Sequence, residues 1–131
     1  MADDSNDIAD LFQDYADAMN DMDAEGIAAL FAYPVTIWQL GRGYVFATPE
    51  ELEENIETLL GVFEDAGVVY SEAAIGPTHV TAYAAFATAS WRQQDEIGDV
   101  VHAFHCAYTL VKQDGDWLIT TIVNDDAAED L

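Results

Sequence analysis

Positive charge is the scarcest property of this chain. Its 131 residues include only three cations, Arg42, Arg92 and Lys112, against 26 aspartate and glutamate residues. Phosphate binding requires a basic face, and three cations scattered along the chain cannot form one. The composition therefore argues against nucleic acid and anionic membrane as partners.

Cysteine and long apolar runs are also scarce. Cys106 is the single cysteine, so no disulfide can form within the chain. Residues 1–4 are acidic and lack the apolar run of a secretory signal, and the apolar stretches elsewhere are too short to cross a bilayer. We therefore expect a cytoplasmic protein with no membrane association.

Acidic residues dominate what is present. The formal net charge of −23 lies well beyond the magnitude of about 2 to 8 that is usual for a small soluble domain. The acids comprise 16 Asp and 10 Glu and are spread over the whole chain. This distribution predicts a surface adapted to high salt, where ions screen self-repulsion. The alternative is an acidic patch that evolved for a basic partner.

The apolar residues are sufficient for one domain over residues 1–131, and their spacing predicts three helices. Ser5 is expected to cap the first helix and Asp23 the second, which should stop before Pro34. Thr48-Pro49-Glu50-Glu51 carries the signals of a third helix, ending at Gly67. The faces expected to be buried are Ile8, Leu11, Phe12, Tyr15 and Met19; then Ile27, Leu30 and Phe31; then Leu52, Ile56, Leu59, Leu60 and Phe63.

Strands are predicted where β-branched and aromatic residues concentrate between Gly, Pro and Asp turns. A first strand runs from Pro34 through Gln39, and a short return strand covers Tyr44 to Ala47. The longer strands are expected at 68–75, 80–92, 100–112 and 117–124.

This order of elements resembles the nuclear transport factor 2-like superfamily, which includes SnoaL-like polyketide cyclases and ketosteroid isomerases. The resemblance rests on the segments 11–20, 21–31 and 34–38, on Gly41-Arg42-Gly43, on the helix start at Thr48, and on Asp114-Gly115-Asp116-Trp117-Leu118-Ile119. It implies an α+β cone, in which three N-terminal helices pack on a curved antiparallel β-sheet around an internal pocket. It also implies a homodimer formed through the outer face of the sheet. The superfamily hosts many activities, so the resemblance implies a fold more firmly than a reaction.

Strand alternation divides the two central strands into opposite faces. We expect the chemically mixed faces to line the pocket and the faces rich in small residues to lie against a second subunit. The expected pocket faces are Phe86, Thr88, Ser90 and Arg92 in one strand, and His102, Phe104, Cys106, Tyr108 and Leu110 in the next. The expected interface faces are Tyr83, Ala85, Ala87, Ala89 and Trp91, and Ala103, His105, Ala107, Thr109 and Val111.

The run His102-Ala103-Phe104-His105-Cys106 looks like a ligand cluster, but strand geometry argues against one. His102 and His105 point to opposite faces, and His102 lies about 13 Å from Cys106 at a rise of about 3.3 Å per residue. We therefore expect no metal site and no cofactor. His105 and Cys106 also point apart, so they cannot form a nucleophile–base couple, and Cys106 is expected to be a small buried hydrophobe.

Tyr15 is expected to point inward, where its hydroxyl needs a protein partner or a ligand. The resemblance to ketosteroid isomerases implies that Tyr15 matches the tyrosine that donates to the developing oxyanion. It also places Gln39 at the position of the carboxylate base, and Cys106 or Ala107 at the position of a protonated aspartate. Since glutamine cannot accept a proton near neutral pH, that isomerase reaction is not expected. A structural hydrogen bond and a ligand contact both remain open for Tyr15.

His102 is the titrating candidate on the expected pocket face, and an ordinary pKa near about 6.5 suits a general acid or base. The alternative is a histidine that is only hydrogen-bonded at the rim. Asn124 closes the last strand, where the resemblance implies polar pocket residues. Arg42 and Arg92 either pair with surface acids or attract an anionic substrate.

Three functions remain open. The first is binding of a small apolar or partly polar molecule in a pocket lined by Tyr15, Gln39, Phe86, Tyr108 and Asn124. The second is a cofactor-independent lyase, isomerase or hydrolase with His102 as base and Tyr15 as oxyanion donor. The third is a dimerisation or partner-docking module with a filled cone. The lack of a carboxylate at Gln39 favours binding over catalysis.

Overall fold

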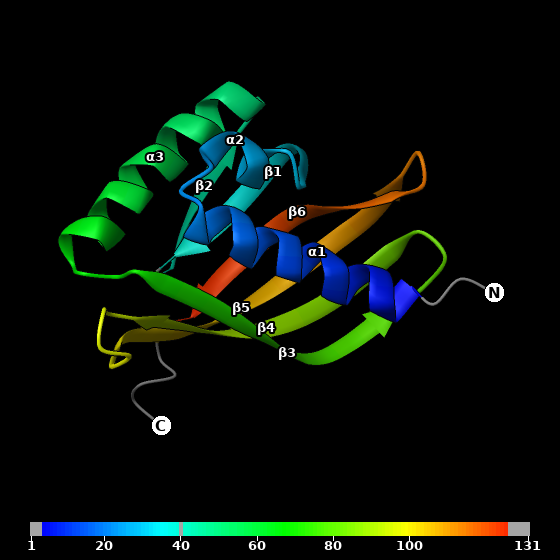
Figure 1. The fold of residues 1–131 in the computed structure, drawn as a ribbon. Helices are drawn as coiled ribbons and strands as arrows, with labels where there is room; N and C mark the ends of the chain where they lie inside the picture. Colours follow the sequence, from blue (N-terminus) through cyan, green and yellow to red (C-terminus); the bar gives the residue numbers. More distant parts are fainter. Residues whose placement is uncertain (1–3, 40, 126–131) are drawn as a thin grey trace.

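The computed structural model describes residues 4–39 and 41–125. It shows a curved six-stranded sheet with three helices on its concave side (Figure 1). In chain order the elements are α1 (Asp4–Asn20), α2 (Ala24–Ala28), β1 (Phe31–Gln39), β2 (Arg42–Phe46), α3 (Pro49–Asp65), β3 (Tyr70–Val80), β4 (Ala84–Gln94), β5 (Val100–Gln113) and β6 (Asp116–Asp125).

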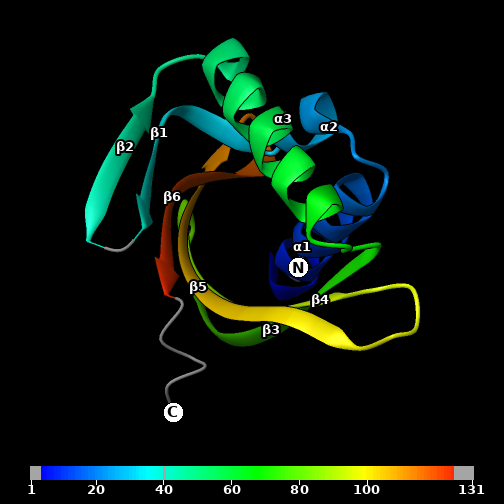
Figure 2. The same ribbon diagram turned by 90° about the vertical axis from the view of Figure 1, so that its left-hand side faces the viewer.

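The sheet is mixed, so the expected antiparallel sheet is wrong in one pairing. Its strand order is β2-β1-β6-β5-β4-β3, and β1 runs parallel to β6 while the other neighbours are antiparallel. The helices also differ from a simple N-terminal group of three, because the β1–β2 hairpin separates α2 from α3. Helix α3 carries the chain from β2 at one edge of the sheet to β3 at the other, across the concave side (Figure 2).

The ends of α3 follow from local sequence signals, as predicted. Thr48 Oγ accepts a hydrogen bond from the Glu51 backbone N–H at 3.3 Å, and Pro49 occupies the first turn. Gly67, just beyond the helix, adopts a φ of +86°, a conformation that glycine takes without steric cost. Helix α1 begins at Asp4, one residue before the expected cap at Ser5.

Two helical expectations are wrong in detail. Leu30 and Phe31 lie outside the second helix, which ends at Ala28. Phe31 belongs to β1, and the Ile119 backbone N–H donates to the Leu30 carbonyl at 3.0 Å. Leu59 is 43% exposed, since α3 buries the stripe Leu52, Ile56 and Leu60 at four-residue spacing. The remaining inward positions of α1 and α3 are buried or pack against the core.

The expected orientation is right for β5 and wrong for β4. Tyr108 and Cys106 face the core, as predicted, but the same register sets Ala87 opposite Tyr108 and Ala89 opposite Cys106. Directly paired residues of antiparallel strands share a face, so the alanines of β4 also face inward. Phe86 consequently lies on the outer face, 53% exposed, whereas Ala87 is 1% exposed. Helix α1 lies inside the curve of the sheet (Figure 2), and the inward alanines of β4 belong to the same core as its buried face.

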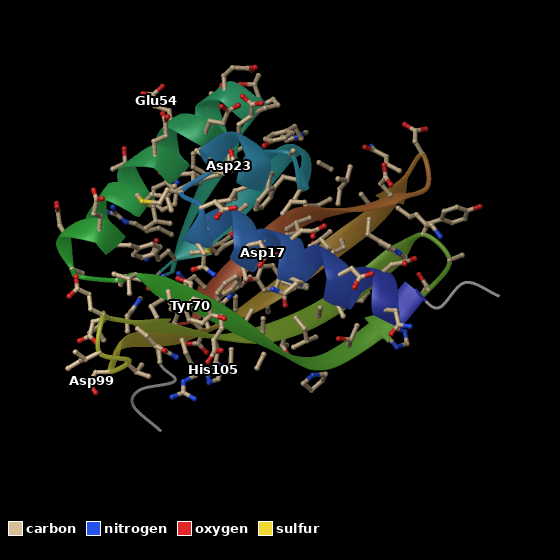
Figure 3. The ribbon with its side chains drawn as sticks, viewed as in Figure 1. Asp17, Asp23, Glu54, Tyr70, Asp99 and His105 are labelled. Carbon is tan, nitrogen blue, oxygen red and sulfur yellow. The ribbon has the colours of Figure 1, made fainter. Side chains whose placement is uncertain are left out.

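The acidic side chains stay at the surface throughout the described residues. The only polar or charged residues buried there are Ser71 and Gln93. Glu54 and Asp99, for example, lie on the outside of the molecule (Figure 3). Within residues 4–39 and 41–125, no helix has the length and apolar character needed to cross a membrane.

Candidate functional site

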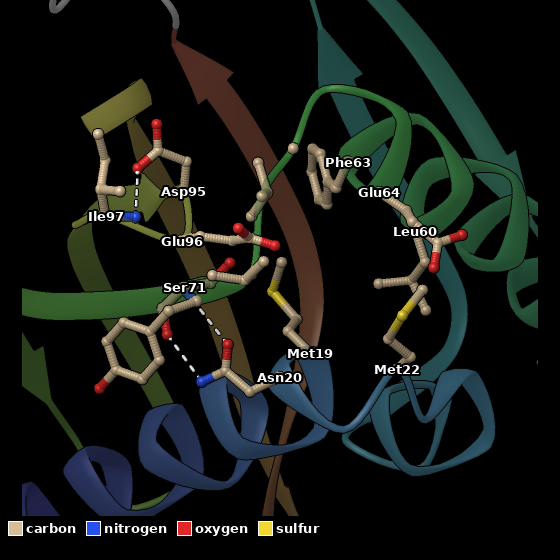
Figure 4. A pocket seen from close by; sticks show the side chains of 14 residues that line it. Met19, Asn20, Met22, Leu60, Phe63, Glu64, Ser71, Asp95, Glu96 and Ile97 are labelled. Carbon is tan, nitrogen blue, oxygen red and sulfur yellow. Dashed lines mark hydrogen bonds between the residues drawn. The ribbon is translucent and has the colours of Figure 1, made fainter. Parts of the chain in front are cut away.

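A series of hydrogen bonds joins the last residue of α1 to β5 across two neighbouring strands. Asn20 Nδ2 donates to the Ser71 carbonyl at 2.9 Å, and the Ser71 N–H donates to Asn20 Oδ1 at 2.7 Å (Figure 4). Gln93 Nε2 donates to Ser71 Oγ at 3.2 Å, and Gln93 Oε1 lies 2.9 Å from His102 Nδ1. We name these four residues the polar chain. Its middle members are almost completely buried, with Ser71 4% and Gln93 0% exposed.

A row of aromatic rings leads from His102 into the core. The ring centroids are 4.9 Å apart for His102 and Phe104, 6.3 Å for Phe104 and Trp91, and 5.2 Å for Trp91 and Tyr15. Two rings therefore separate His102 from Tyr15. The two residues proposed as base and oxyanion donor share the concave face, and no ring contact or hydrogen bond between them is found among the described residues.

Tyr15 sits between two aromatic neighbours, with Trp91 on one side and Phe31 on the other at 5.9 Å. No hydrogen bond of its hydroxyl is found among the described residues. Burial raises the pKa of the Tyr15 phenol above its ordinary value, and Cys106 adds to the shift. The structural hydrogen bond that Tyr15 could have made is thus not found in the described part of the chain.

Tyr108 has a structural partner. Its hydroxyl accepts a hydrogen bond from Trp91 Nε1 at 2.8 Å, and its ring meets Phe12 edge-on at 4.7 Å. Burial raises the pKa of the Tyr108 phenol well above its ordinary value. Cys106 is buried beside these rings, as expected for a small hydrophobe.

A cavity of about 570 Å³ opens where α1 and α3 end, next to the β4–β5 loop (Figure 4). We name it the open-end cavity. The apolar part of its wall consists of Met19, Met22, Leu60, Phe63, Val68, Val69, Tyr70 and Ile97. Asn20 and Ser71 connect it to the polar chain, and Glu64, Asp95 and Glu96 are its acidic members.

The residues predicted to form a pocket do not line the open-end cavity. Asn124 lies on the concave side of β6, opposite Cys106, and its Oδ1 is buried with no hydrogen-bond partner among the described residues. Gln39 is exposed at the end of β1, in register with Asn124. Phe86 is on the outer face because of the register of β4 with β5.

Sequence reasoning missed three members of the polar chain, namely Asn20, Ser71 and Gln93. One signal was available for Gln93. Folding the β4 segment back on β5 about the turn at Gly98 sets Gln93 opposite His102, so both must share a face. Asn20 and Ser71 are 51 residues apart in the chain, and no local pattern connects them.

The outer face of the sheet carries a second hollow, a shallow groove of about 340 Å³. We name it the outer groove. Its wall includes Phe86, Thr88, Ala107, Thr121 and Val123, and no acidic residue contributes to it. His105 lies on this outer side, exposed and 2.7 Å from Ser90 Oγ through its Nδ1. His102 and His105 thus lie on opposite faces, as predicted, and no group of three or more His, Cys, Asp or Glu in residues 4–39 and 41–125 is placed to hold a metal ion.

The family model described as NTF2-like protein (DUF6841) matches residues 4–127. The chain belongs to this NTF2-like family. The resemblance that the sequence suggested is therefore confirmed. No curated protein matches the sequence of this NTF2-like chain.

Solved structures show the same fold at low sequence identity. A domain of unknown function with a cystatin-like fold from Nostoc punctiforme is 18% identical, with a TM-score of 0.77 over 96% of this chain and 78% of that one. The protein Aln2 from a Streptomyces species is 18% identical, with a TM-score of 0.75 over 98% and 94%. A ketosteroid isomerase-like protein from Erwinia carotovora atroseptica is 21% identical, with a TM-score of 0.70 over 95% and 96%. At these identities the similarity shows the fold alone.

Proposed function

We propose that this NTF2-like protein binds a small, mostly apolar molecule in the open-end cavity. The observation that carries the proposal is the cavity itself. Its volume of about 570 Å³ falls within the range of about 300 to 1,000 Å³ typical of ligand pockets. Apolar side chains supply eight of the fourteen lining residues, and Asn20 and Ser71 supply a polar edge.

The charges around the cavity favour a neutral or cationic ligand over an anion. Glu64, Asp95 and Glu96 contribute to the wall, and none of the three cations of the chain does. Arg42 and Arg92 are exposed and lie outside the cavity wall. Attraction of an anionic substrate by these arginines is therefore not part of the proposal.

The proposal predicts that filling the cavity abolishes binding. Titration with the neutral fluorescent probe N-phenyl-1-naphthylamine should give saturable emission with the wild type and a large loss of affinity with Val69→Trp, because Val69 lines the cavity. Val62→Trp is the matched control, since Val62 is similarly exposed, at 56% against 54%, but does not line the cavity. Equal affinities for the two variants would contradict the proposal.

Two polar groups deeper in the cone support a ligand with some polar character. The Tyr15 hydroxyl has no hydrogen bond among the described residues, and Asn124 Oδ1 is buried without a partner there. A hydrogen-bonding group on the ligand would satisfy either of them. Tyr15 and Asn124 do not line the open-end cavity, so we propose them as contacts only for a ligand that reaches beyond it, and we no longer propose Phe86.

A cofactor-independent lyase, isomerase or hydrolase is the second candidate function. What favours it is the ordered imidazole of His102, whose Nδ1 is held by a fully buried glutamine. The two rings between His102 and Tyr15 weigh against joint action on one substrate atom. If substrate screening yields turnover, His102→Asn should abolish it while probe binding in the cavity persists.

We further propose a homodimer formed through the outer groove. The chain has 26 acidic residues, and burying a carboxylate at an interface is costly. Because no acidic residue lines the outer groove, a second copy can dock there without that cost. Exposed Phe86 and Val123 supply apolar area there. The third candidate is a dimerisation or partner-docking module, in which side chains fill the cone and no ligand binds. Saturable probe binding in the open-end cavity would count against it.

A further inference from the structure

Gln93 is the only residue with a long polar side chain that is completely buried in the described part of the molecule. Burying an amide is costly unless its donor and acceptor are both satisfied. Here both ends are used, because Nε2 donates to Ser71 Oγ at 3.2 Å and Oε1 faces His102 Nδ1 at 2.9 Å. An apolar side chain would fill the same space without needing hydrogen-bond partners. The presence of a glutamine here therefore points to a role for its amide.

The orientation of the Gln93 amide decides where the proton of neutral His102 resides. With its nitrogen directed at Ser71, Gln93 turns its carbonyl oxygen towards the imidazole, and a carbonyl oxygen can only accept. His102 Nδ1 must therefore donate, which leaves Nε2 of the neutral ring with a lone pair. No hydrogen-bond partner of this Nε2 is found among residues 4–39 and 41–125.

We propose that Gln93 is a positioning residue that fixes His102 as the Nδ1–H tautomer, and that Nε2 is thereby a hydrogen-bond acceptor for a neutral ligand bearing a hydroxyl, enol or N–H group. In this orientation Ser71 Oγ accepts from the amide nitrogen, and Asn20 holds the Ser71 backbone through a reciprocal pair of hydrogen bonds (Figure 4). In this state neutral His102 accepts a proton and cannot donate one from the open nitrogen. His102 does not line the open-end cavity, so neither half of the proposal rests on ligand binding there.

The tautomer can be measured without any ligand. The measurement is a long-range ¹H–¹⁵N correlation spectrum, recorded at a pH high enough for the imidazole rings to be neutral. The chain has three imidazoles, those of His79, His102 and His105. We expect His102 to show a protonated Nδ1 and an unprotonated Nε2. Ser71→Ala and Gln93→Leu should both increase the Nε2–H form. A wild-type spectrum in which His102 Nε2 is protonated would overturn the assignment. So would His102 signals that are the same in the wild type and in both variants.

The outer face of the same strands supplies the matched control. His105 Nδ1 lies 2.7 Å from Ser90 Oγ, outside the polar chain. Ser90→Ala should therefore move the His105 signals and leave those of His102 in place. The wild-type spectrum answers the tautomer question even if Gln93→Leu does not fold.

The acceptor site is tested by a pair of probes of which only one has a hydrogen-bond donor. Phenol, which is neutral at the pH of the measurement, should shift the His102 Nε2 signal, whereas anisole, its methyl ether, should not. Equal shifts with both probes, or none with phenol, would refute the acceptor half. Naphthylamine binding in the open-end cavity is measured separately, so a failure here is distinguishable from a failure of the proposed function.

Discussion

At the scale of one residue, Tyr15 is a partly buried tyrosine whose ring packs against the core. Its ring packs between Trp91 and Phe31, while its hydroxyl has no hydrogen bond in the described part of the chain. The neighbouring Tyr108 differs, because its hydroxyl accepts from Trp91. Removing the hydroxyl of Tyr15 should therefore leave no protein group without a partner, in contrast to removing that of Tyr108.

The variant Tyr15→Phe is predicted to affect stability only in alkali. At pH 7 its melting temperature should match the wild type, and a loss of about 1 to 3 kcal/mol would instead reveal a structural partner. Burial raises the pKa of Tyr15 in the folded state, so the folded protein resists ionisation and the unfolded chain loses the proton first, near about pH 10. Stability is thus constant below that pH and falls above it.

Melting curves from pH 7 to pH 12 measure this difference. Above about pH 10, Tyr15→Phe should lose unfolding free energy less steeply than the wild type, by about 1.4 kcal/mol per pH unit for one group. Tyr83→Phe is the control, because Tyr83 is 75% exposed. The account of Tyr15 fails if both variants follow the wild-type curve. Tyr108 contributes in the same direction in all three proteins.

At the scale of the elements, β4 has one face for the core and one for the outside. Ala87 is 1% exposed and belongs to the core, whereas Phe86 is 53% exposed in the outer groove. The orientation of this strand decides which face can meet a second subunit. It also reverses the expectation that the alanines of β4 lie between subunits.

A glutamate at these two adjacent positions is predicted to have opposite consequences. Ala87→Glu places a charge in the core at a cost of several kcal/mol and should give unfolded or insoluble protein. Phe86→Glu should fold normally by circular dichroism but be monomeric by light scattering. Tyr83→Glu, outside the outer groove, should stay dimeric. An unaltered dimer for Phe86→Glu would show that the interface lies elsewhere.

Local signals in the sequence predicted the ends of α3 and the orientation of β5 correctly. The cap at Thr48 and the end of α3 at Gly67 depend on a few adjacent residues, and His102, Cys106 and Tyr108 alternate without interruption. The orientation of β4 was not predictable from side-chain size, because small residues suit a close helix as well as a close subunit. The parallel β1–β6 pair and the polar chain depend on contacts between distant segments, which no local pattern contains.

At the scale of the whole molecule, the surface carries nearly all the ionisable groups and one sign of charge prevails. The formal net charge is −23, and no aspartate or glutamate is buried among the described residues. Such a molecule repels itself in dilute buffer. We propose that it is adapted to high salt. At 1 M salt the screening length is only about 3 Å, so repulsion between more distant charges is largely suppressed.

The salt dependence of the melting temperature tests this adaptation. The temperature should rise steeply from dilute buffer to molar KCl, because screening weakens repulsion among the 26 acids. Most of the rise should occur at low ionic strength, where the screening length changes most. A melting temperature that is flat with salt would contradict the proposed adaptation.

The central claim is that a small molecule binds in the open-end cavity, and methionine methyl signals test it most directly. The chain has three methionines, and two of them, Met19 and Met22, line this cavity. In protein labelled with ¹³C at the methionine methyls, N-phenyl-1-naphthylamine should shift the Met19 and Met22 signals saturably, with the same dissociation constant as the fluorescence titration. Saturable fluorescence with both methyl signals unmoved would place the probe elsewhere and contradict the claim.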